Sequence, residues 1–217
     1  MHIAVFGGSF NPIHYGHLRI AEEVLEGVGP DKVVFMPSCI TPHKAGEELL
    51  DPLLRLEMLR IAIMGNPGLD ASDIEIKRGG RSYTIDTVKE LKGSPEDGKA
   101  PSISLIVGTD SFNEITTWCE YEELFTLASF IVVGRPGHPA KKPAEALPVE
   151  LARKFWYDAP TESYRNSYGN SVVYPATTMM GISSSGIRER IGDNRSVRYL
   201  LPDAVIGFIR EMGLYRA

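Results

Sequence analysis

The stretch HIAVFGGSFNPIHYGHLRIAEEVLEG, residues 2–27, predicts a strand, a glycine-containing loop and a helix in immediate succession. Residues 2–6 form an unbroken apolar run, which is typical of a strand buried on both faces of a parallel sheet. Residues 18–27 place apolar side chains three and four positions apart, which predicts a helix. Gly7 and Gly8 allow backbone conformations that other residues resist and a close approach by a ligand. Free N–H groups and the positive end of a helix dipole therefore meet at this loop, and they predict an anion site.

The same alternation continues along the chain and predicts the fold. We expect further strands at 32–37, 72–76, 102–107, 129–134 and 171–176, and helices at 52–63, 84–92, 184–191 and 203–212. Strands that alternate with helices predict an α/β fold, here a Rossmann-like, doubly wound and mostly parallel sheet with helices on both faces. Ligands bind such a sheet at the carboxyl ends of its strands, at the topological switch point.

The domain organisation is expected to be simple. We expect residues 1–217 to form a single domain, because the length suits one core and strand-like sequence resumes at 171–176. The segment 136–170, between the predicted strands 129–134 and 171–176, is rich in proline, lysine and polar aromatic residues. We expect an irregular excursion there. The oligomeric state stays open, with a homo-oligomer among the options.

Composition and charge exclude several classes of partner. The chain carries 23 Lys and Arg against 28 Asp and Glu, a formal net charge of −5, which argues against general binding to nucleic acid or an anionic membrane. No apolar run has membrane-spanning length and no secretory leader is recognisable, so we expect a cytoplasmic protein. Cys39 and Cys119 lack metal-ligand spacing and are expected to be reduced and structural.

Two histidines follow the glycine turn. His14 and His17 are three positions apart, so both side chains can reach one ligand from the first helical turn. Imidazoles can donate hydrogen bonds to phosphate oxygens or ligate a metal. The loop lacks the GKS or GKT ending of a P-loop and is not GxGxxG. A hydrolase with a metal on the two histidines would need a third ligand, and none stands at a convincing spacing.

A second polar motif lies about 170 residues downstream, GISSSGIRERI at 181–191. Serines at the start of a helix cap it, and we expect Ser183 or Ser184 to do so here. The spare hydroxyls and N–H groups can face an anion. Arg188 follows within the first turns, where a planar guanidinium can hold phosphate oxygens.

The two motifs together resemble the signature of the HxGH nucleotidyltransferase superfamily, which includes class I aminoacyl-tRNA synthetases. The chain is similar to the bacterial nicotinate-nucleotide adenylyltransferase family in further segments, which are TPHK (41–44), RSYTIDTV (81–88), VGTDSF (107–112), TWCEYEEL (117–124) and VVGRPG (132–137). Thr41 stands where that family commonly has proline, and Ser185 replaces its usual threonine while keeping the hydroxyl.

The resemblance implies transfer of AMP from ATP to nicotinate mononucleotide, which gives deamido-NAD and pyrophosphate, with Mg²⁺ carried on ATP and no metal held by the protein itself. His14, His17 and Arg188 are the implied catalytic residues. The implied ATP-binding residues are Gly7, Gly8, Ser9, Phe10, His14, His17, Gly108, Asp110, Ser184, Ser185 and Arg188. Those implied for the mononucleotide are Lys44, Tyr83, Thr84, Asp110, Trp118 and Arg135.

Three alternatives remain open at this point. One is another HxGH adenylyltransferase, with nicotinamide mononucleotide or pantetheine phosphate as the acceptor. The second is a nucleotide-binding protein without turnover, although such a protein would have less need of both motifs. The third is the metal-dependent hydrolase considered above.

Overall fold

A computed structural model describes residues 1–40, 49–93 and 100–216. In this part of the chain, eight strands form one sheet in the order β3-β2-β1-β4-β5-β8-β7-β6. The strands are β1 (His2–Gly8), β2 (Lys32–Pro37), β3 (Leu69–Ala71), β4 (Ser102–Gly108), β5 (Ser129–Val133), β6 (Phe155–Asp158), β7 (Ser163–Asn166) and β8 (Ser171–Val173). The longer helices are α1 (Tyr15–Val28), α2 (Pro52–Ile63), α4 (Thr84–Gly93), α6 (Tyr121–Leu127), α9 (Ser184–Gly192) and α10 (Asp203–Glu211). The shorter ones are α3 (Ile74–Arg78), α5 (Thr109–Asn113), η2 (Ile115–Thr117), α7 (Pro143–Ala146), α8 (Val149–Ala152) and η3 (Ala159–Thr161).

The strand order places a switch point between β1 and β4. From β1 the chain moves outward to β2 and β3, then returns to the other side of β1 as β4 and continues to β5. All these neighbours pair in parallel, as do β5 and β8, whereas β7 and β6 are antiparallel to the strands beside them. The predicted Rossmann-like, mostly parallel fold is confirmed. The loops after β1 and β4 therefore lie side by side at the carboxyl edge of the sheet.

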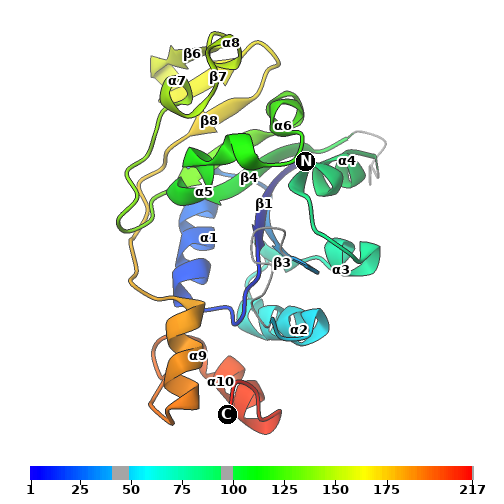
Figure 1. The fold of residues 1–217 in the computed structure, drawn as a ribbon, viewed down its shortest axis with the longest axis vertical. Coiled ribbons are helices and arrows are strands. Elements are labelled where there is room, and N and C mark those ends of the chain that lie inside the picture. Colours follow the sequence, from blue (N-terminus) through cyan, green and yellow to red (C-terminus); the bar gives the residue numbers. More distant parts are fainter. Residues whose placement is uncertain (41–48, 94–99, 217) are drawn as a thin grey trace.

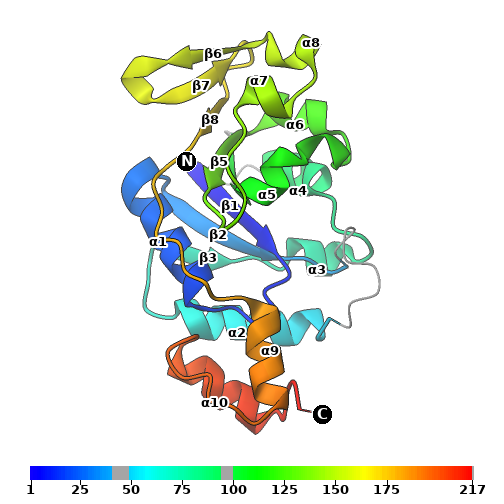
Figure 2. The same ribbon diagram turned by 60° about the vertical axis from the view of Figure 1, so that its left-hand side comes forward.

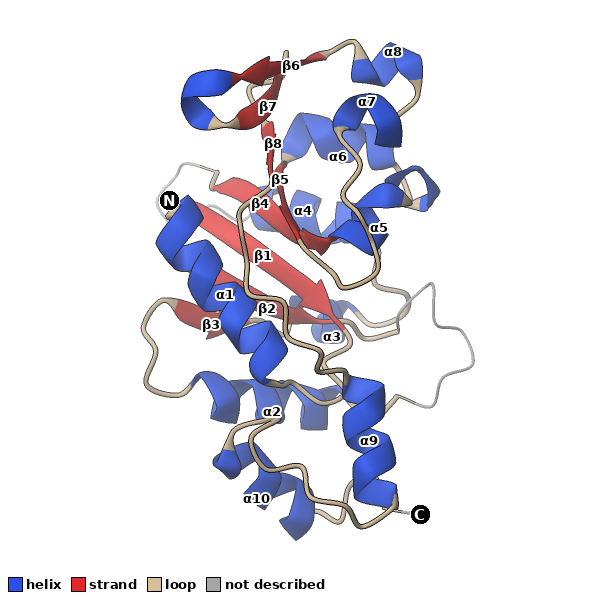
Figure 3. Ribbon diagram, turned by 90° about the vertical axis from the view of Figure 1, so that its left-hand side faces the viewer, coloured by secondary structure: helices blue, strands red, loops and turns tan. Residues whose placement is uncertain are grey.

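Helices cover both faces of the sheet, with α1 on one side and α3 and α4 on the other (Figure 1). The α1 face buries a cluster that joins β1, α1, α2 and α10 and includes Phe6, Val24, Leu59 and Ile206. The opposite face buries a second cluster under α4 and α6, with Phe112, Phe125 and Phe130 at its centre. Figure 3 shows α1 crossing in front of β1, with α2 and α10 below it. These two cores hold the ends of β1 and β4 in place.

The predicted strand at 72–76 is wrong. Strand β3 ends at Ala71, and residues 74–78 form helix α3. The change occurs at Ser72, whose N–H donates to the Phe35 carbonyl while its hydroxyl accepts from the N–H of Ile74. The short run IEI fits a strand or a helical turn by pattern alone. Helix packing decides here, because it buries Glu75 against the hydroxyl of Thr87 at 2.7 Å.

The segment 136–170 is more regular than the sequence predicts. It contains the short helices α7 and α8 and the strands β6 and β7, which extend the sheet as an antiparallel hairpin. Lysine and tyrosine side chains help to fix it, since Lys142 Nζ lies 4.0 Å from the ring centroid of Tyr174. Such a cation–π contact leaves no periodic pattern in the sequence, so the regular structure of 136–170 could not be predicted from it.

After β8 the chain returns to the carboxyl edge of the sheet. The segment that leads to α9 passes beside α1 (Figure 2), and Thr178 is fixed there by two hydrogen bonds to the carboxylate of Glu23. This return brings α9 to the start of α1. In the part of the chain that the structure describes, every helix is too short or too polar to span a bilayer.

Candidate functional site

The loop after β1 is shaped by tight packing around Phe10. Phe10 is buried and has a φ of 44°, and its ring lies over Gly8. A Cβ on Gly8 would lie 3.0 Å from Cζ of that ring, so only glycine fits without movement. The Gly8 carbonyl also accepts a hydrogen bond from the N–H of Ser38. The loop is therefore held from within and from the neighbouring strand.

The two histidines stack on each other at the start of α1. His14 is the N-cap residue and His17 lies in the first turn, with ring centroids 3.7 Å apart and an interplanar angle of 23°. Gly16 makes this possible, because a Cβ there would lie 3.0 Å from His14 Nδ1. The Nδ1 atoms of both rings are buried, and neither has a hydrogen-bond partner among the described residues. Two unpaired ring nitrogens in one place point to a ligand that completes them.

Burial sets the charge state of both rings. It lowers the pKa of His14 to about 4, with the positive charge of Arg135 adding to the effect. Burial lowers the pKa of His17 well below its usual value as well, and His14 and Arg135 contribute. Both imidazoles are therefore neutral at pH 7 in the free protein, which allows close stacking without charge repulsion. A neutral imidazole keeps one N–H donor and one acceptor.

Helix α9 binds directly to the histidine loop. Ser184 Oγ donates to the Pro12 carbonyl at 2.8 Å, and Arg188 Nη1 donates to the Asn11 carbonyl at 2.8 Å. Ser183 is the N-cap, since its side chain accepts from the N–H of Gly186. Ser185 is exposed at the helix start. The two motifs separated by some 170 residues thus form one surface, as the sequence predicts.

The loop after β4 adds a carboxylate and a cation to this edge. Asp110 lies in the first turn of α5, and its Oδ2 is 3.3 Å from Nη1 of Arg135, which follows β5. Its Oδ1 is buried and has no hydrogen-bond partner among the described residues. A Cβ on Gly108 would collide with that same oxygen. Gly108 is therefore required for Asp110 to fold back over the strand end.

Three of the residues implied for the mononucleotide, Tyr83, Thr84 and Trp118, lie at the start of α4 and directly after η2. Thr84 begins α4, so its N–H is one of the helix N–H groups without an intrahelical partner. Tyr83 and Trp118 are both half-buried and pack on the second core cluster. Lys44 and the TPHK segment lie outside the described residues, so their placement stays a prediction.

Comparison with known proteins places this geometry in a family. The cytidylyltransferase-like family profile matches residues 5–190. The chain belongs to the cytidylyltransferase-like family. A "Probable nicotinate-nucleotide adenylyltransferase" of Citrifermentans bemidjiense is 47% identical over 216 residues, covering 99% of this chain and 98% of the relative. A protein of the same name from Geobacter sp. strain M21 is 45% identical over 215 residues, covering 99% and 98%.

A solved structure has the same fold. The nicotinic acid mononucleotide adenylyltransferase of Plasmodium falciparum, complexed with NaAD, superposes with a TM-score of 0.72 at 19% identity, covering 99% of this chain and 97% of the other.

Two residues that contact the loop after β1, a half-buried tyrosine and a buried arginine, were not predicted from the sequence. Tyr215, near the end of the described chain, donates from its hydroxyl to Asn11 Oδ1 at 2.8 Å. Arg55 of α2 is fully buried and donates to the carbonyls of Ser9 and Ser38. Neither belongs to a motif. From the sequence alone, an arginine near the start of a helix is expected to be exposed, and only the three-dimensional contacts show that Arg55 is buried.

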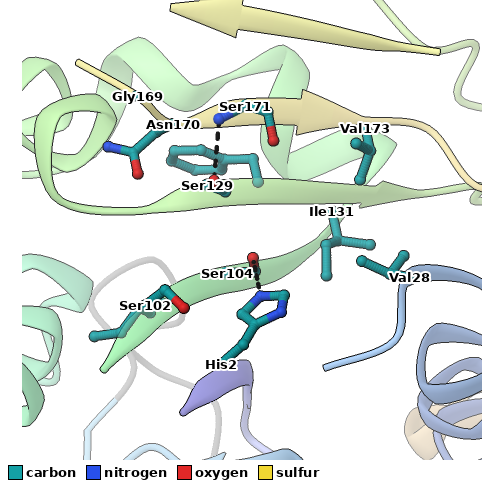
Figure 4. A pocket seen from close by; sticks show the side chains of 12 residues that line it. His2, Val28, Ser102, Ser104, Ser129, Ile131, Gly169, Asn170, Ser171 and Val173 are labelled. Carbon is teal, nitrogen blue, oxygen red and sulfur yellow. Dashed lines mark hydrogen bonds between the residues drawn. The ribbon is translucent and has the colours of Figure 1, made fainter. Parts of the chain in front are cut away.

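A separate cavity lies away from this site. It measures about 300 Å³ and is lined by residues at the amino ends of β1, β4 and β5, opposite the switch point (Figure 4). His2 and Ser104 form a hydrogen bond of 2.8 Å within it, and the Ser129 hydroxyl accepts from the N–H of Ser171. These polar groups partner each other, so the cavity wall offers few free donors. We assign the candidate site to the switch point, because the unpaired histidine nitrogens lie there and because ligands bind this type of sheet at that edge.

The described residues at the switch point include the cations Arg135 and Arg188 and several hydrogen-bond donors. Among the described residues, no group of three or more His, Cys, Asp or Glu side chains is arranged to hold a metal ion. Asp110 is the carboxylate that faces the strand ends, and it is paired with Arg135. This set of side chains suits phosphate oxygens, because imidazole, guanidinium and main-chain N–H groups all donate hydrogen bonds to them.

Proposed function

We propose that this protein transfers AMP from ATP to nicotinate mononucleotide, which gives deamido-NAD and pyrophosphate. Two relatives that are 45% and 47% identical to nearly the whole chain are named for this activity. The observation that carries the proposal is the hydrogen bond from Arg188 to the loop that holds His14 and His17. This contact brings a cationic donor, Arg188, and two neutral imidazoles together at the switch point of a nucleotide-binding fold. They lie together although the chain as a whole has a net charge of −5.

The chemistry requires alignment and charge stabilisation more than proton transfer. The attacking group is the 5′-phosphate of the mononucleotide, which is already ionised, so it needs no general base. Its oxygen forms a bond to the α-phosphorus of ATP as the bond to the β-phosphate oxygen breaks, and pyrophosphate leaves. His14, His17 and Arg188 donate to the triphosphate oxygens, on which negative charge grows as pyrophosphate departs. Gly7, Gly8, Ser9, Phe10, Ser184 and Ser185 line the surface around them.

The adenylate and the acceptor need separate partners. Asp110 accepts from a ribose hydroxyl through Oδ1, the buried oxygen that lacks a hydrogen bond in the free protein. Gly108 lets that carboxylate reach its place. On the acceptor side, Lys44 and Arg135 bind the mononucleotide phosphate, and Trp118 offers a flat face for the pyridine ring. The N–H groups at Tyr83 and Thr84, where α4 begins, meet the nicotinate carboxylate.

Magnesium enters this scheme with the nucleotide. Mg²⁺ keeps several water ligands and is commonly bound through substrate phosphates with one or two carboxylates. Among the described residues no cluster of carboxylates could form a protein-held cage, and Asp110 fits the role of a lone carboxylate near the substrate phosphates. When bound, the ion offsets negative charge on the triphosphate.

The test is an acceptor panel. Purified protein is incubated with ATP, Mg²⁺ and one of nicotinate mononucleotide, nicotinamide mononucleotide or pantetheine phosphate, while pyrophosphate release is followed and the product is identified by mass. We expect pyrophosphate and deamido-NAD in equal amounts with nicotinate mononucleotide, and little with the other two. Turnover with pantetheine phosphate alone would contradict the proposal. ATP binding without pyrophosphate from any acceptor would identify a nucleotide-binding protein instead.

A further inference from the structure

Arg55 is the largest of the fully buried side chains in the described structure. It projects from the first turns of α2, a helix whose start is fixed by Asp51, which accepts from the N–H of Leu53. Its guanidinium donates from Nε to the Leu50 carbonyl at 2.8 Å, from Nη1 to the Ser9 carbonyl at 2.7 Å and from Nη2 to the Ser38 carbonyl at 2.7 Å. A longer contact of 3.4 Å joins Nη2 to the Cys39 carbonyl.

These acceptors belong to two different loops at the carboxyl edge of the sheet. Ser9 lies in the loop after β1, between the glycines and the histidines. Ser38 and Cys39 directly follow β2. One rigid guanidinium plane therefore sets the distance between the two loops.

The second loop is in turn connected to the start of α4. The N–H of Cys39 donates to the Ser82 hydroxyl at 2.9 Å, and the N–H of Ser82 donates to the Ile40 carbonyl at 3.0 Å. Ser82 directly precedes Tyr83 and Thr84. A continuous series of hydrogen bonds thus runs from Ser9 through Arg55 to the N-terminus of α4.

We infer that Arg55 is a positioning residue that fixes the ATP-binding loop relative to the acceptor-binding segment, so that the two substrates meet in line. This inference rests on the proposed function, which places ATP at the loop after β1 and the mononucleotide at the start of α4. Arg55 itself is enclosed by protein and touches neither substrate.

Burial of an arginine costs free energy, because the guanidinium loses its hydration, and this cost must be offset by other interactions. Burial lowers the pKa of Arg55, as desolvation does for any cation. Hydrogen bonds to main-chain carbonyls replace the lost water, and a change that left these carbonyls unpaired would let the loops relax apart. Misplacement by about 1 Å is enough to slow a reaction between two bound groups about 100-fold. Each loop alone still holds its own substrate.

The expected signature is therefore a loss of turnover with binding retained. Arg55→Met fills a similar space but lacks the guanidinium donors, and it should lower kcat about 100-fold. The Kd values for an α,β-methylene analogue of ATP and for the mononucleotide should stay within about 3-fold of wild type. Arg55→Lys keeps the charge and reaches fewer carbonyls at once, so it should recover part of kcat, about 10-fold above Arg55→Met. Arg60→Met on the same helix is the control, because Arg60 is half exposed and its nearest carboxylate oxygen, on Glu57, is 4.0 Å away.

The experiment compares wild type and the three variants by steady-state kinetics and by calorimetric titration of each substrate, with circular dichroism and melting temperature to measure the folded fraction. Wild-type kcat in folded Arg55→Met overturns the inference, as does loss of only one substrate's binding, which would confine Arg55 to one loop. If Arg55→Met does not fold, Arg55→Lys decides: reduced kcat with both Kd values retained supports positioning, and unchanged kcat overturns it. If neither variant folds, Arg55 is a stabilising residue only and the inference is overturned. Absence of adenylyl transfer by the wild type would instead refute the proposed function.

Discussion

Arg188 of α9 donates from Nη1 to the main-chain oxygen of Asn11 at 2.8 Å, across 177 positions of sequence. The contact orients the guanidinium beside the histidine loop and leaves its remaining N–H groups for a ligand. Ser184 reinforces the junction through the Pro12 carbonyl. The two motifs proposed to bind the triphosphate are therefore joined in the free protein, and electrostatic catalysis requires such preorganisation.

Removal of the Arg188 guanidinium should impair catalysis severely. We expect Arg188→Met to lower kcat/KM for ATP by about 100-fold or more, since a charged donor to the triphosphate is lost. Arg190→Met is the matched control on the same helix, because Arg190 donates to the Ser196 carbonyl at the other end of α9. Steady-state rates of pyrophosphate release measure both variants. Equal losses in the two would assign the effect to helix α9 and not to the site.

His17 should contribute more to turnover than to ATP affinity. Its ring stacks on His14, and its buried Nδ1 has no partner in the described structure, so the ring has hydrogen-bonding capacity that the free protein does not use. We expect His17→Ala to reduce kcat about 100- to 1,000-fold while Kd for ATP changes less than 10-fold. His138→Ala, at an exposed histidine, should leave both values unchanged. Normal turnover by His17→Ala would show that the ring has no phosphate role.

Gly16 tests whether the stacked geometry matters. A methyl group there would lie 3.0 Å from His14 Nδ1 and 3.1 Å from its Cε1, so the ring must shift. We expect Gly16→Ala to lower kcat at least 10-fold with little loss of stability, because alanine favours the helix. Gly27→Ala in the same helix meets no atom within 4 Å and should stabilise the fold by about 0.5–1 kcal/mol with kcat unchanged. Kinetics and urea unfolding of the pair separate the two effects.

The sequence allowed prediction of whatever depends on local pattern or motif. Strand β1 and helix α1 could be predicted because apolar runs and helical period indicate them. The pairing of the His14 loop with Arg188 was implied by the resemblance of the two motifs to one superfamily. The IEI segment could not be predicted, because a run that short fits two periods and only packing against α4 decides between them. The roles of Arg55 and Tyr215 could not be predicted for another reason. Their roles arise from carbonyls and side chains brought near by folding, and a lone arginine or tyrosine carries no pattern.

Acidification should destabilise the protein through the buried histidines. The pKa of His14 is about 4 in the folded chain against 6.5 for an unperturbed histidine, so the unfolded chain binds more protons between these values. The contribution of His14 is fully present above pH 6.5 and is lost as pH falls toward 4, by about 2 kcal/mol between pH 7 and pH 5. His14→Gln should reduce this pH dependence, whereas exposed His138→Gln should not. Urea unfolding at the two pH values measures it, and an identical slope in wild type and His14→Gln would contradict the prediction.

Selectivity for the acid over the amide follows from the donors at the start of α4. The N–H groups at Tyr83 and Thr84 have no carbonyl one turn earlier in the helix, so they favour a carboxylate oxygen. A nicotinamide would present its NH₂ group to these donors and leave them unpaired, at a cost of about 1–3 kcal/mol and more where charge is lost. We therefore expect kcat/KM for nicotinate mononucleotide to exceed that for nicotinamide mononucleotide by at least about 100-fold. Parallel assays with both mononucleotides at one ATP concentration measure the ratio, and a ratio near one would show that these N–H groups do not read the carboxylate.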